Sequence, residues 1–453
     1  MLSSRKRELN VLTQVFNKEE NEAVILYGAY GLGKTRIVRE FCKDKRAFYY
    51  MAKQASELQQ KIFFEAEAKS QFDVDIISNE YTDVINGVVK ADPQKLVLVI
   101  DEFQYIAKKD ESFMKAVVDA LKSSSDKIMV ILVCSQIGWI GSELPNILKN
   151  NSQNKIFHAH RVNEIGFVDL VQTLERYDTR ECVKIYGIIG GIPKYLDRWN
   201  KSRTVKDNVC KLILSPNGTL YNEVDRIIGS ELREQAVYST ILYALATGKN
   251  KLNDLFAYTG FSRAKISVYI NNLIDLDIVE KVDSYETAGH VNTKKGVYQI
   301  KNTLVNFYYR FIYANQSALN LLSETDFYDM YVEPELNEYL DRYFVKVCQE
   351  YLLLLSKIGR LPLKITKIGS WVGKQGNIDI IASDDSGNAI IGLCRWKDRT
   401  VTYSMCLDLF DLMGQAKISA DYYYLFSSRA FDEKLKKEAA KEPRIILVDI
   451  SSL

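Results

Sequence analysis

The sequence predicts an α/β protein that begins with a doubly wound parallel sheet over residues 1–163. Three short, unbroken apolar runs indicate the sheet, at 22–27, 96–100 and 127–133. Runs of this kind suit strands that are covered on both faces, as the strands of parallel sheets are. Helical patterns separate the runs, which is typical of strands joined by crossover helices.

Composition and charge narrow the classes of function. The 453 residues are enough for roughly two to four domains. A net charge of +2 gives no overall basic excess, so any nucleic-acid contact would depend on a local patch. The polar N-terminus is unlike a signal peptide, and no apolar run approaches the roughly 20 residues that cross a bilayer, so no membrane partner is expected. Seven scattered cysteines without a CxxC pair favour reduced thiols and a cytoplasmic protein over a structural zinc site.

A glycine-rich turn follows the first apolar run and fits the pattern GxxxxGK[ST] at every fixed position. Its eight residues are Gly28, Ala29, Tyr30, Gly31, Leu32, Gly33, Lys34 and Thr35. The glycines let backbone N–H groups curl around phosphates, and the N-terminus of the following helix favours negative charge. Lys34 would reach the β- and γ-phosphates, and the Thr35 hydroxyl would bind Mg²⁺. A chance turn is the alternative, but the flanking strand and helix favour a P-loop for a nucleoside triphosphate.

Acidic residues at the end of the second apolar run complete this predicted site. Asp101 would hold Mg²⁺, and Glu102 would orient and deprotonate the attacking water. Two solvated acids at a strand end are the alternative. The third run ends near Ser135, a candidate for contact with the γ-phosphate or the water, although small polar residues end many strands.

The rest of the chain divides into four predicted parts. Residues 164–235 have a helical pattern that the sequence GGIP interrupts at 190–193. Residues 236–305 resemble a winged helix, with three short helices and two strands around a polar loop. An aromatic-rich helical connector at 306–337 precedes an α/β region at 338–453.

Four stretches together resemble one group of proteins, the archaeal-type AAA-related ATPases of the STAND group. They are RKREL at 5–9, DEFQ at 101–104, GGIPKYL at 190–196 and NFYYRFIY at 306–313. The resemblance implies ATP rather than GTP as the nucleotide, and a helical lid that brings Gly191 and Pro193 near the phosphates. It also implies that the region of Arg5 packs near the adenine. Arg161 is a candidate for sensing the γ-phosphate or acting across a subunit interface, although an arginine there is more often structural.

The second helix of the predicted winged helix carries polar residues on the face that could enter a DNA major groove. These are Arg263, Lys265, Ser267, Tyr269, Asn271 and Asn272, with Ser262 as the N-cap. Lys294 and Lys295 would lie in the wing. Double-stranded DNA is one expected partner, and a protein partner or a second copy of the chain is an equal alternative.

Residues 338–453 resemble the restriction-endonuclease-like PD-(D/E)XK fold in their order of helices and strands. Asp379 stands where that family has its strand Asp, but Asn377 replaces an acid common just before it. Leu393 stands in place of the second acid, and Arg395 in place of the lysine. Leucine cannot bind a metal and arginine stays protonated, so a degenerate nuclease fold is expected. A relocated site from Glu350, Asp379 and Lys397 is an alternative.

We therefore expect an ATP-hydrolysing protein whose nucleotide state repositions a winged helix and a nuclease-like C-terminal domain. One alternative is an ATP-gated DNA nuclease, against which Leu393 and Arg395 argue. The other is a DNA- or protein-binding module that holds ATP with negligible turnover, against which Glu102 argues.

Overall fold

The computed structural model describes most of the chain. The described residues are 5–74, 76–123, 127–150, 156–286, 296–373, 376–397 and 400–452. They form two compact units, which we describe separately. The first consists of Met1–Glu164 with Ile192–Lys194 and Asp275–Asp277, and the second contains the remaining residues up to Leu453.

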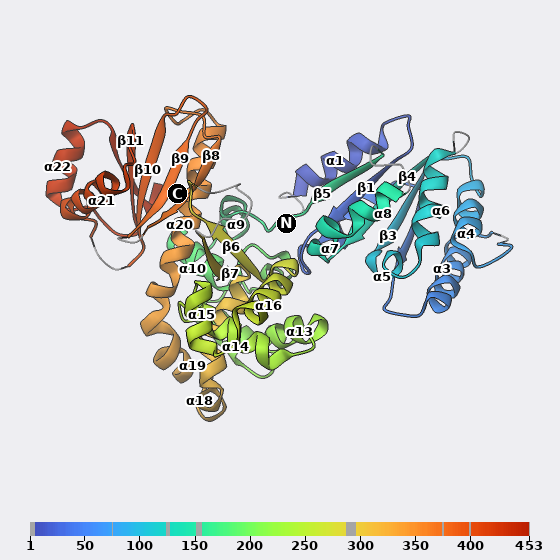
Figure 1. The fold of residues 1–453 in the computed structure, drawn as a ribbon, viewed down its shortest axis with the longest axis horizontal. Helices are drawn as coiled ribbons and strands as arrows, with labels where there is room; N and C mark the ends of the chain where they lie inside the picture. The colour runs from blue at the N-terminus through green and yellow to red at the C-terminus, as the bar shows by residue number, and fades with distance from the viewer. Residues whose placement is uncertain are drawn as a thin grey trace. The chain divides into compact units, whose positions relative to one another are not determined.

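The first unit contains a five-stranded parallel sheet with the strand order β2-β3-β4-β1-β5 (Figure 1). Its strands are β1 (Glu22–Tyr27), β2 (Ala47–Met51), β3 (Leu96–Asp101), β4 (Ile128–Cys134) and β5 (Phe157–Arg161). The predicted parallel α/β fold is confirmed, and the three apolar runs are β1, β3 and β4. Because all strands run in one direction, their C-terminal ends meet at one edge of the sheet.

Helices cover both faces of this sheet. They are α1 (Lys6–Phe16), α2 (Lys34–Cys42), α3 (Glu57–Gln71), α4 (Tyr81–Lys90), α5 (Gln104–Ala107), α6 (Glu111–Lys122), α7 (Ile137–Ser142) and α8 (Leu144–Asn150). Leu98 and Ile100 belong to a core cluster with side chains of α3, α4 and α6, while Val97 and Val99 are buried on the other face. This double coverage explains the continuous apolar runs.

The second unit begins with helices and a two-stranded hairpin. They are α9 (Phe167–Thr173), α10 (Thr179–Ile189), α12 (Val205–Val209), η2 (Cys210–Leu214), α13 (Glu223–Glu231), α14 (Gln235–Ala246), α15 (Leu252–Thr259), α16 (Arg263–Asp275), β6 (Val279–Asp283) and β7 (Gly296–Ile300). The short helix α11 (Pro193–Leu196) lies where the chain passes from the first unit to the second. Helices α14 to α16 and the antiparallel pair β6–β7 match the predicted winged-helix pattern.

A helical segment leads to the C-terminal sheet. It contains α17 (Thr303–Phe307), η3 (Tyr308–Ile312), η4 (Tyr313–Asn315), α18 (Gln316–Leu321), α19 (Glu324–Phe327), η5 (Tyr328–Val332) and α20 (Glu333–Lys357). The segments η2, η3 and η5 are π-helical. Helix α20 begins at Glu333, so it runs through the predicted boundary between 337 and 338. None of the helices in the described part of the chain combines the length and apolarity needed to span a membrane.

The C-terminal sheet is mixed, with the strand order β12-β11-β10-β9-β8 (Figure 1). Its elements are β8 (Lys367–Val372), β9 (Asn377–Ser383), β10 (Ala389–Arg395), α21 (Tyr403–Ala416), β11 (Tyr422–Ser427), α22 (Glu433–Lys441), β12 (Ile445–Asp449) and η6 (Ile450–Ser452). Strands β8, β9 and β10 pair antiparallel, whereas β10, β11 and β12 pair parallel. These helices and strands agree with the α/β region that was predicted for residues 338–453.

Glu350 joins three helices within the second unit. From α20, its Oε1 atom accepts a hydrogen bond of 2.7 Å from the Tyr186 hydroxyl on α10. Its Oε2 atom accepts one of 2.6 Å from the backbone N–H of Phe167, the first residue of α9. Both oxygens of this carboxylate therefore fix the packing of α9 and α10 on α20.

We predict that Glu350→Gln destabilises the protein by roughly 1–2 kcal/mol, because an amide cannot accept two charge-assisted hydrogen bonds. Urea unfolding followed by circular dichroism measures this change. Glu338→Gln is the matched control, since Glu338 lies on the same helix, its side chain is 69% exposed, and its one ion pair within the described residues is with Lys397 at 3.7 Å. Equal unfolding midpoints for the two variants would contradict this role of Glu350.

Candidate nucleotide-binding site

The loop between β1 and α2 forms a backbone cradle whose shape requires glycine. Gly31 and Gly33 have φ angles of 89° and 83°, in the left-handed region that other residues rarely adopt. Gly33 also precedes the first turn of α2. A Cβ atom on Gly28 would lie 2.4 Å from the carbonyl oxygen of Val162, so no side chain fits there. The loop therefore presents its N–H groups at the N-terminus of α2, as a phosphate site needs.

Lys34 lies inside this cradle. Its Nζ atom donates hydrogen bonds of 2.7 Å to the carbonyl oxygen of Gly28 and 3.0 Å to that of Ala29. Burial lowers the pKa of the Lys34 ammonium, and the nearby carboxylates of Glu102 and Asp101 oppose this shift. A buried cation beside the loop is suited to bind anionic phosphate oxygens.

Thr35 and Asp101 meet across the sheet edge. The Thr35 hydroxyl donates a hydrogen bond of 2.7 Å to Asp101 Oδ2, and the same oxygen accepts one of 2.6 Å from the Tyr49 hydroxyl on β2. Asp101 is 1% exposed. A hydroxyl and a carboxylate are hard oxygen ligands of the kind Mg²⁺ takes in nucleotide sites, where phosphate and water complete its octahedron. The pair fits a magnesium ion.

Glu102 follows directly and is held in a defined direction. Its φ angle of 54° is uncommon for a residue with a side chain, and such strain is typical of functional sites. The carboxylate atom Oε2 accepts hydrogen bonds of 2.5 Å from Ser135 Oγ and 2.5 Å from Gln104 Nε2. Gln104 is fully buried and its Oε1 atom has no hydrogen-bond partner within the described residues. Ser135 and Gln104 thus orient Glu102.

The GGIP segment divides between two local environments. Within the second unit, the Ile165 N–H donates a 2.8 Å hydrogen bond to Gly191 O, and a Cβ on Gly191 would lie 1.8 Å from Ile165 O. Within the first unit, the Lys194 N–H donates a 3.1 Å hydrogen bond to Gly31 O, and Pro193 packs beside Gly33. The expected closeness to the loop therefore applies to Pro193, whereas Gly191 packs on the Ile165 backbone.

The side chain of Arg5 contacts the backbone of the loop. Its guanidinium donates hydrogen bonds of 2.9 Å to Leu32 O and 2.8 Å to Asn163 O, and it pairs with Glu8 at 3.1 Å. Only 6% of Arg5 is exposed. Arg5 thus contacts the phosphate loop, and the packing of its region near the adenine, which the family resemblance implies, remains a prediction.

Arg161, at the end of β5, forms an ion pair of 2.9 Å with Asp277 Oδ1. Both residues belong to the first unit. The guanidinium is 38% exposed. Its expected role in sensing the γ-phosphate or in a subunit contact remains a prediction.

The predicted DNA-contacting residues lie on α16 or beside it. Ser262, Arg263, Asn271 and Asn272 are exposed, while the other three are partly buried. Arg263 Nε donates a 3.0 Å hydrogen bond to Asn253, and Lys265 Nζ lies 5.1 Å and 5.5 Å from the centres of two aromatic rings. The predicted wing residues Lys294 and Lys295 lie outside the described residues.

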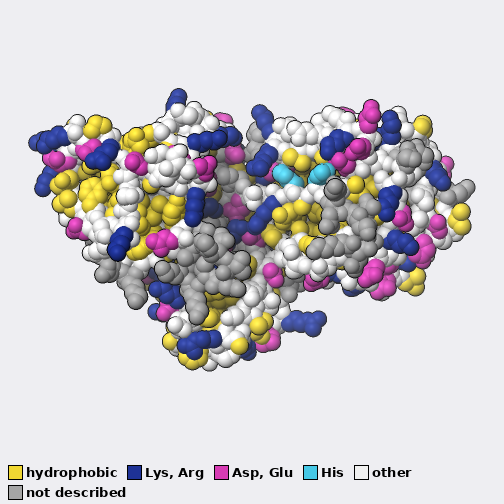
Figure 2. Space-filling model, turned by 45° about the horizontal axis from the view of Figure 1, so that its top comes forward, with side chains coloured by type: hydrophobic (Ala, Val, Ile, Leu, Met, Phe, Trp, Pro, Cys, Tyr) yellow, Lys and Arg dark blue, Asp and Glu magenta, His cyan; other side chains and the backbone are white. Residues whose placement is uncertain are grey.

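Charge on the molecular surface is mixed. On the face drawn in Figure 2, Lys and Arg side chains of the described residues are scattered among Asp and Glu side chains. Exposed Asp254 and Asp275 lie on the helices α15 and α16 themselves. Any DNA contact would therefore depend on a small number of cations.

The C-terminal sheet places Asp379 against a cation. Arg395 Nη1 lies 2.9 Å from Asp379 Oδ2, which also accepts a 2.8 Å hydrogen bond from the Cys394 N–H. Burial raises the pKa of Asp379, and Arg395 opposes this shift. Leu393 is 5% exposed and belongs to the hydrophobic core of this sheet, with residues of α21. The position of the second nuclease acid is thus filled by core packing.

The alternative site from Glu350, Asp379 and Lys397 does not assemble. Both Glu350 oxygens bind Tyr186 and the Phe167 backbone, as described above. Lys397 lies 3.7 Å from Glu338 and 3.7 Å from Asp341. In the described part of the chain, no three Asp, Glu, His or Cys side chains converge so as to hold a metal ion.

Sequence analysis assigned no role to Gln104 or Tyr49, and it did not predict the contact of Arg5 with the loop. Gln104 belongs to the DEFQ stretch, and a polar residue two positions after Glu102 was a usable signal. Tyr49 and Arg5 bind Asp101 and Leu32 from distant parts of the chain, and neither contact follows from spacing.

Three family models match parts of the chain. Residues 2–198 match an ATPase domain predominantly from Archaea. Residues 239–281 match the arsR family of bacterial regulatory proteins, and residues 308–405 match a family of archaeal and bacterial proteins of unknown function. In these ranges the chain is therefore similar to archaeal ATPase domains, to arsR-family regulatory proteins and to the family of unknown function.

Individual proteins resemble the chain over most of its length. An uncharacterized protein of Methanocaldococcus jannaschii is 28% identical over 404 residues, which are 88% of this chain and 88% of the relative. The structure of a Walker-type ATPase of Pyrococcus abyssi gives a TM-score of 0.50 at 16% identity, covering 68% of this chain and 95% of its own. At this identity the likeness shows a shared fold.

We predict that the purified chain does not cut supercoiled plasmid in the presence of Mg²⁺ or Mn²⁺ and ATP. Metal-assisted hydrolysis needs convergent carboxylates, and here the one retained acid is bound to Arg395. Agarose gels of plasmid incubated with wild type, Asp379→Ala and Lys34→Ala measure nicking. Cleavage that is lost in Asp379→Ala but kept in Lys34→Ala would overturn this prediction.

Proposed function

We propose that this chain, whose residues 2–198 form an ATPase domain of the predominantly archaeal type, binds ATP with magnesium and hydrolyses it. The observation that carries the proposal is the placement of the oriented Glu102 carboxylate directly after Asp101, which itself lies 2.7 Å from Thr35 at the end of the loop. A site that only held a nucleotide would need no carboxylate oriented by two further side chains.

The loop and Lys34 would bind the phosphates. The N–H groups of residues 28–35 surround the β-phosphate, and the Lys34 ammonium exchanges its loop carbonyls for β- and γ-phosphate oxygens. Thr35 and Asp101 would hold Mg²⁺, which neutralises charge that develops on those oxygens. Tyr49 would keep the Asp101 carboxylate turned toward Thr35, because its hydroxyl is bonded to the same oxygen.

Glu102 would accept a proton from the attacking water. Ser135 and Gln104 donate to one oxygen of its carboxylate, which leaves the other oxygen to bind that water. Ser135 would therefore act through Glu102, in addition to any contact with the γ-phosphate. The resemblance to the archaeal-type ATPases supports ATP as the nucleotide.

The nucleotide state would reposition the second unit through the chain itself. Lys194, bonded to the loop at Gly31, is followed directly by Tyr195 of the second unit. A change in loop conformation between ATP and ADP would alter this bond and the path of α11. The hydrogen bond between Lys194 and Gly31 therefore supports the proposal of a nucleotide-driven movement of the winged helix and the C-terminal domain.

We predict that Lys34→Ala weakens ATP binding at least tenfold, because it removes the buried cation of the cradle. Glu102→Gln should keep ATP binding and lower turnover about 100-fold or more, since it removes the base and leaves Thr35 and Asp101 in place. Binding of a fluorescent ATP analogue and phosphate release measure the two effects.

Glu111→Gln is the matched control for Glu102→Gln, because Glu111 is an exposed acid in the first turn of α6 in the same unit. It should leave both quantities unchanged. Turnover by Glu102→Gln equal to that of wild type would exclude Glu102 as the base. Undiminished ATP binding by Lys34→Ala would exclude the whole site.

A second candidate function is binding of double-stranded DNA by α16. The match of 239–281 to a family of bacterial regulatory proteins and the exposed Arg263 and Asn271 favour it. The aromatic contacts of Lys265 and the acids on α15 and α16 favour a protein partner instead. The two alternatives differ in salt dependence.

If α16 binds DNA, affinity should fall steeply as salt rises, because phosphate contacts release counterions. Arg263→Ala combined with Lys265→Ala should weaken binding about tenfold or more in fluorescence anisotropy at low salt. Lys436→Ala with Lys441→Ala removes the same charge from α22, where both lysines pair with acids of their own helix, and should have little effect. If the protein does not bind DNA at low salt with either ATP or ADP, a protein partner of α16 is the remaining alternative.

A further inference from the structure

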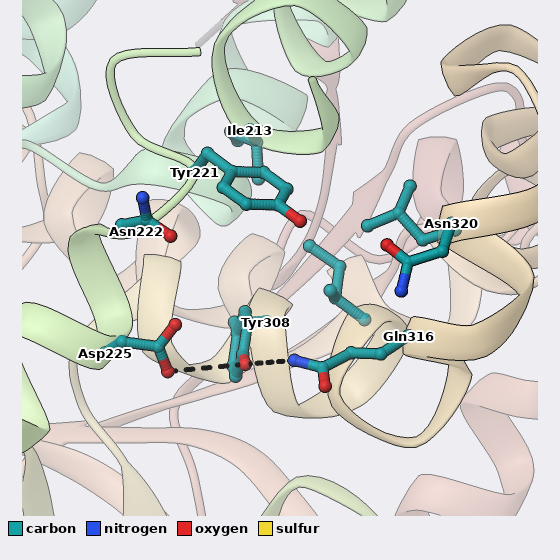
Figure 3. A pocket seen from close by; sticks show the side chains of 9 residues that line it. Ile213, Tyr221, Asn222, Asp225, Tyr308, Gln316 and Asn320 are labelled. Atoms are coloured by element: carbon teal, nitrogen blue, oxygen red, sulfur yellow. Dashed lines mark hydrogen bonds between the residues drawn. The ribbon is translucent and has the colours of Figure 1, made fainter. Parts of the chain in front are cut away.

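A small cleft opens in the second unit between the helix α13 and the segment η3–α18 (Figure 3). It has a volume of about 180 Å³. The lining residues are Ile213, Tyr221, Asn222, Asp225, Tyr308, Ile312, Gln316, Leu319 and Asn320. Three aliphatic side chains and the Tyr308 ring are buried and form an apolar floor. Asn222, Asp225, Gln316 and Asn320 are exposed and form a polar rim. A ligand for this cleft would have an apolar body and a polar head.

Two walls of the cleft come from π-helical segments. Ile213 belongs to η2, and Tyr308 and Ile312 belong to η3. π-helices account for well under about 1% of residues in proteins and are often found at functional sites. Wider turns displace side chains from the positions that an α-helix would give them, which opens space between neighbouring helices. The shape of the cleft thus depends on the π-helical backbone of η2 and η3.

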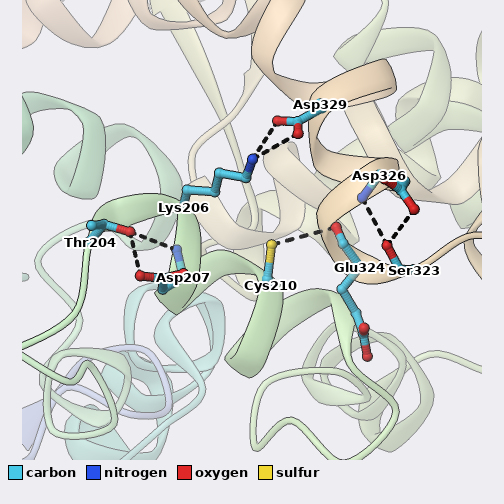
Figure 4. A network of polar contacts seen from close by, with 8 residues as sticks. All are labelled: Thr204, Lys206, Asp207, Cys210, Ser323, Glu324, Asp326 and Asp329. Carbon is cyan, nitrogen blue, oxygen red and sulfur yellow. Dashed lines mark hydrogen bonds and ion pairs between the residues drawn. The ribbon is translucent and has the colours of Figure 1, made fainter.

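A polar network fixes the neighbouring wall (Figure 4). Lys206 Nζ lies 2.6 Å and 2.8 Å from the two carboxylate oxygens of Asp329 on η5. The Cys210 thiol, at the start of η2, donates a 3.5 Å hydrogen bond to Glu324 O on α19. These contacts hold α12 against η5 and η2 against α19. The cleft therefore exists before a ligand arrives, which lowers the entropy cost of binding.

The charge on the rim of the cleft determines which class of ligand it can bind. Asp225 is the one carboxylate in the rim, and among the described residues its side chain contacts a single polar group, the Tyr308 hydroxyl at 3.5 Å. The neighbouring Arg226 is bound to Glu223 at 2.8 Å. Gln316 Nε2 donates a 2.8 Å hydrogen bond to the Tyr308 hydroxyl, which turns that hydroxyl toward Asp225. A carboxylate without a cation thus faces a cleft with two tyrosine rings.

We propose that this cleft binds a small organic cation, an ammonium group on a short apolar body. The ammonium would pair with Asp225 and donate to the amide oxygens of Asn222 and Asn320. The apolar body would rest on Ile312 and Leu319, and the rings of Tyr221 and Tyr308 would add cation–π attraction. The volume lies below the about 300–1,000 Å³ of sites for drug-sized ligands, so the ligand is a small molecule. One carboxylate gives too few charged ligands for a divalent metal ion.

The experiment titrates the full chain with 3-methylbutylamine by calorimetry at neutral pH, where the amine is protonated. The uncharged 3-methylbutan-1-ol has the same shape and is the matched ligand. We expect the amine to bind at least tenfold more tightly than the alcohol. Asp225→Asn should reduce the amine affinity about tenfold and leave the alcohol unaffected, since it removes the negative charge that pairs with the ammonium group.

Two control variants sharpen the test. Glu324→Gln removes the same charge from a side chain that does not line the cleft, and it should leave amine binding unchanged. Lys34→Ala should also keep amine binding, so failure of the ATPase proposal and failure of this one are distinguishable. Equal binding of amine and alcohol, full amine binding by Asp225→Asn, or no binding up to about 10 mM amine would each overturn the proposal.

Discussion

The hydrogen bond of 2.7 Å between the Thr35 hydroxyl and the Asp101 carboxylate is the interaction on which the nucleotide site depends. It joins the first turn of α2 to the end of β3, although β4 lies between β1 and β3 in the sheet. The parallel sheet brings these two chain segments to one edge, because all of its strands end on the same side. Once Asp101 is placed there, the next residue, Glu102, must turn sharply. Its positive φ angle and its two hydrogen bonds direct the carboxylate to the space beside the loop.

The C-terminal sheet also contains an aspartate, Asp379, but its surroundings differ from those of Asp101. Asp101 accepts hydrogen bonds from two neutral hydroxyls and lies near the Lys34 ammonium, but it forms no direct ion pair within the described residues, so it can still attract a metal cation. Asp379 is bonded by the guanidinium of Arg395, which already neutralises it, and Leu393 next to it packs in the core. A metal ion would have to displace a permanent cation at a partly buried position. Asp101 is therefore suited to bind a metal ion, whereas Asp379 in the C-terminal sheet is already paired with Arg395.

Features that depend on residues close together in the sequence could be predicted, whereas features that depend on contacts between distant segments could not. The strands β1, β3 and β4 were recognisable because a strand buried on both faces is an unbroken apolar run. Strands β2 and β5 lie at the sheet edges. The sequence of β5, FHAHR, mixes apolar and polar residues, so it does not stand out as an apolar run. The loop residues and Asp101 follow from spacing. The hydrogen bonds of Tyr49 and Arg5 do not, because they depend on which distant segments the fold brings together. The π-helical turns of η2 and η3 were also unpredictable, since they keep a helical hydrophobic pattern.

The loop is held from two sides by bonds of unequal strength. Arg5, buried and charged, donates to Leu32 O at 2.9 Å, whereas the neutral N–H of Lys194 donates to Gly31 O at 3.1 Å. A hydrogen bond from a charged group contributes about 1.5–3 kcal/mol, compared with about 0.5–1.5 kcal/mol for a neutral one. Any change in the loop that must break one bond will therefore break the bond to Lys194 and keep the bond to Arg5. Lys194 leads into the second unit and Arg5 leads into α1 of the first, which supports the proposal that the nucleotide state acts on the second unit through Lys194.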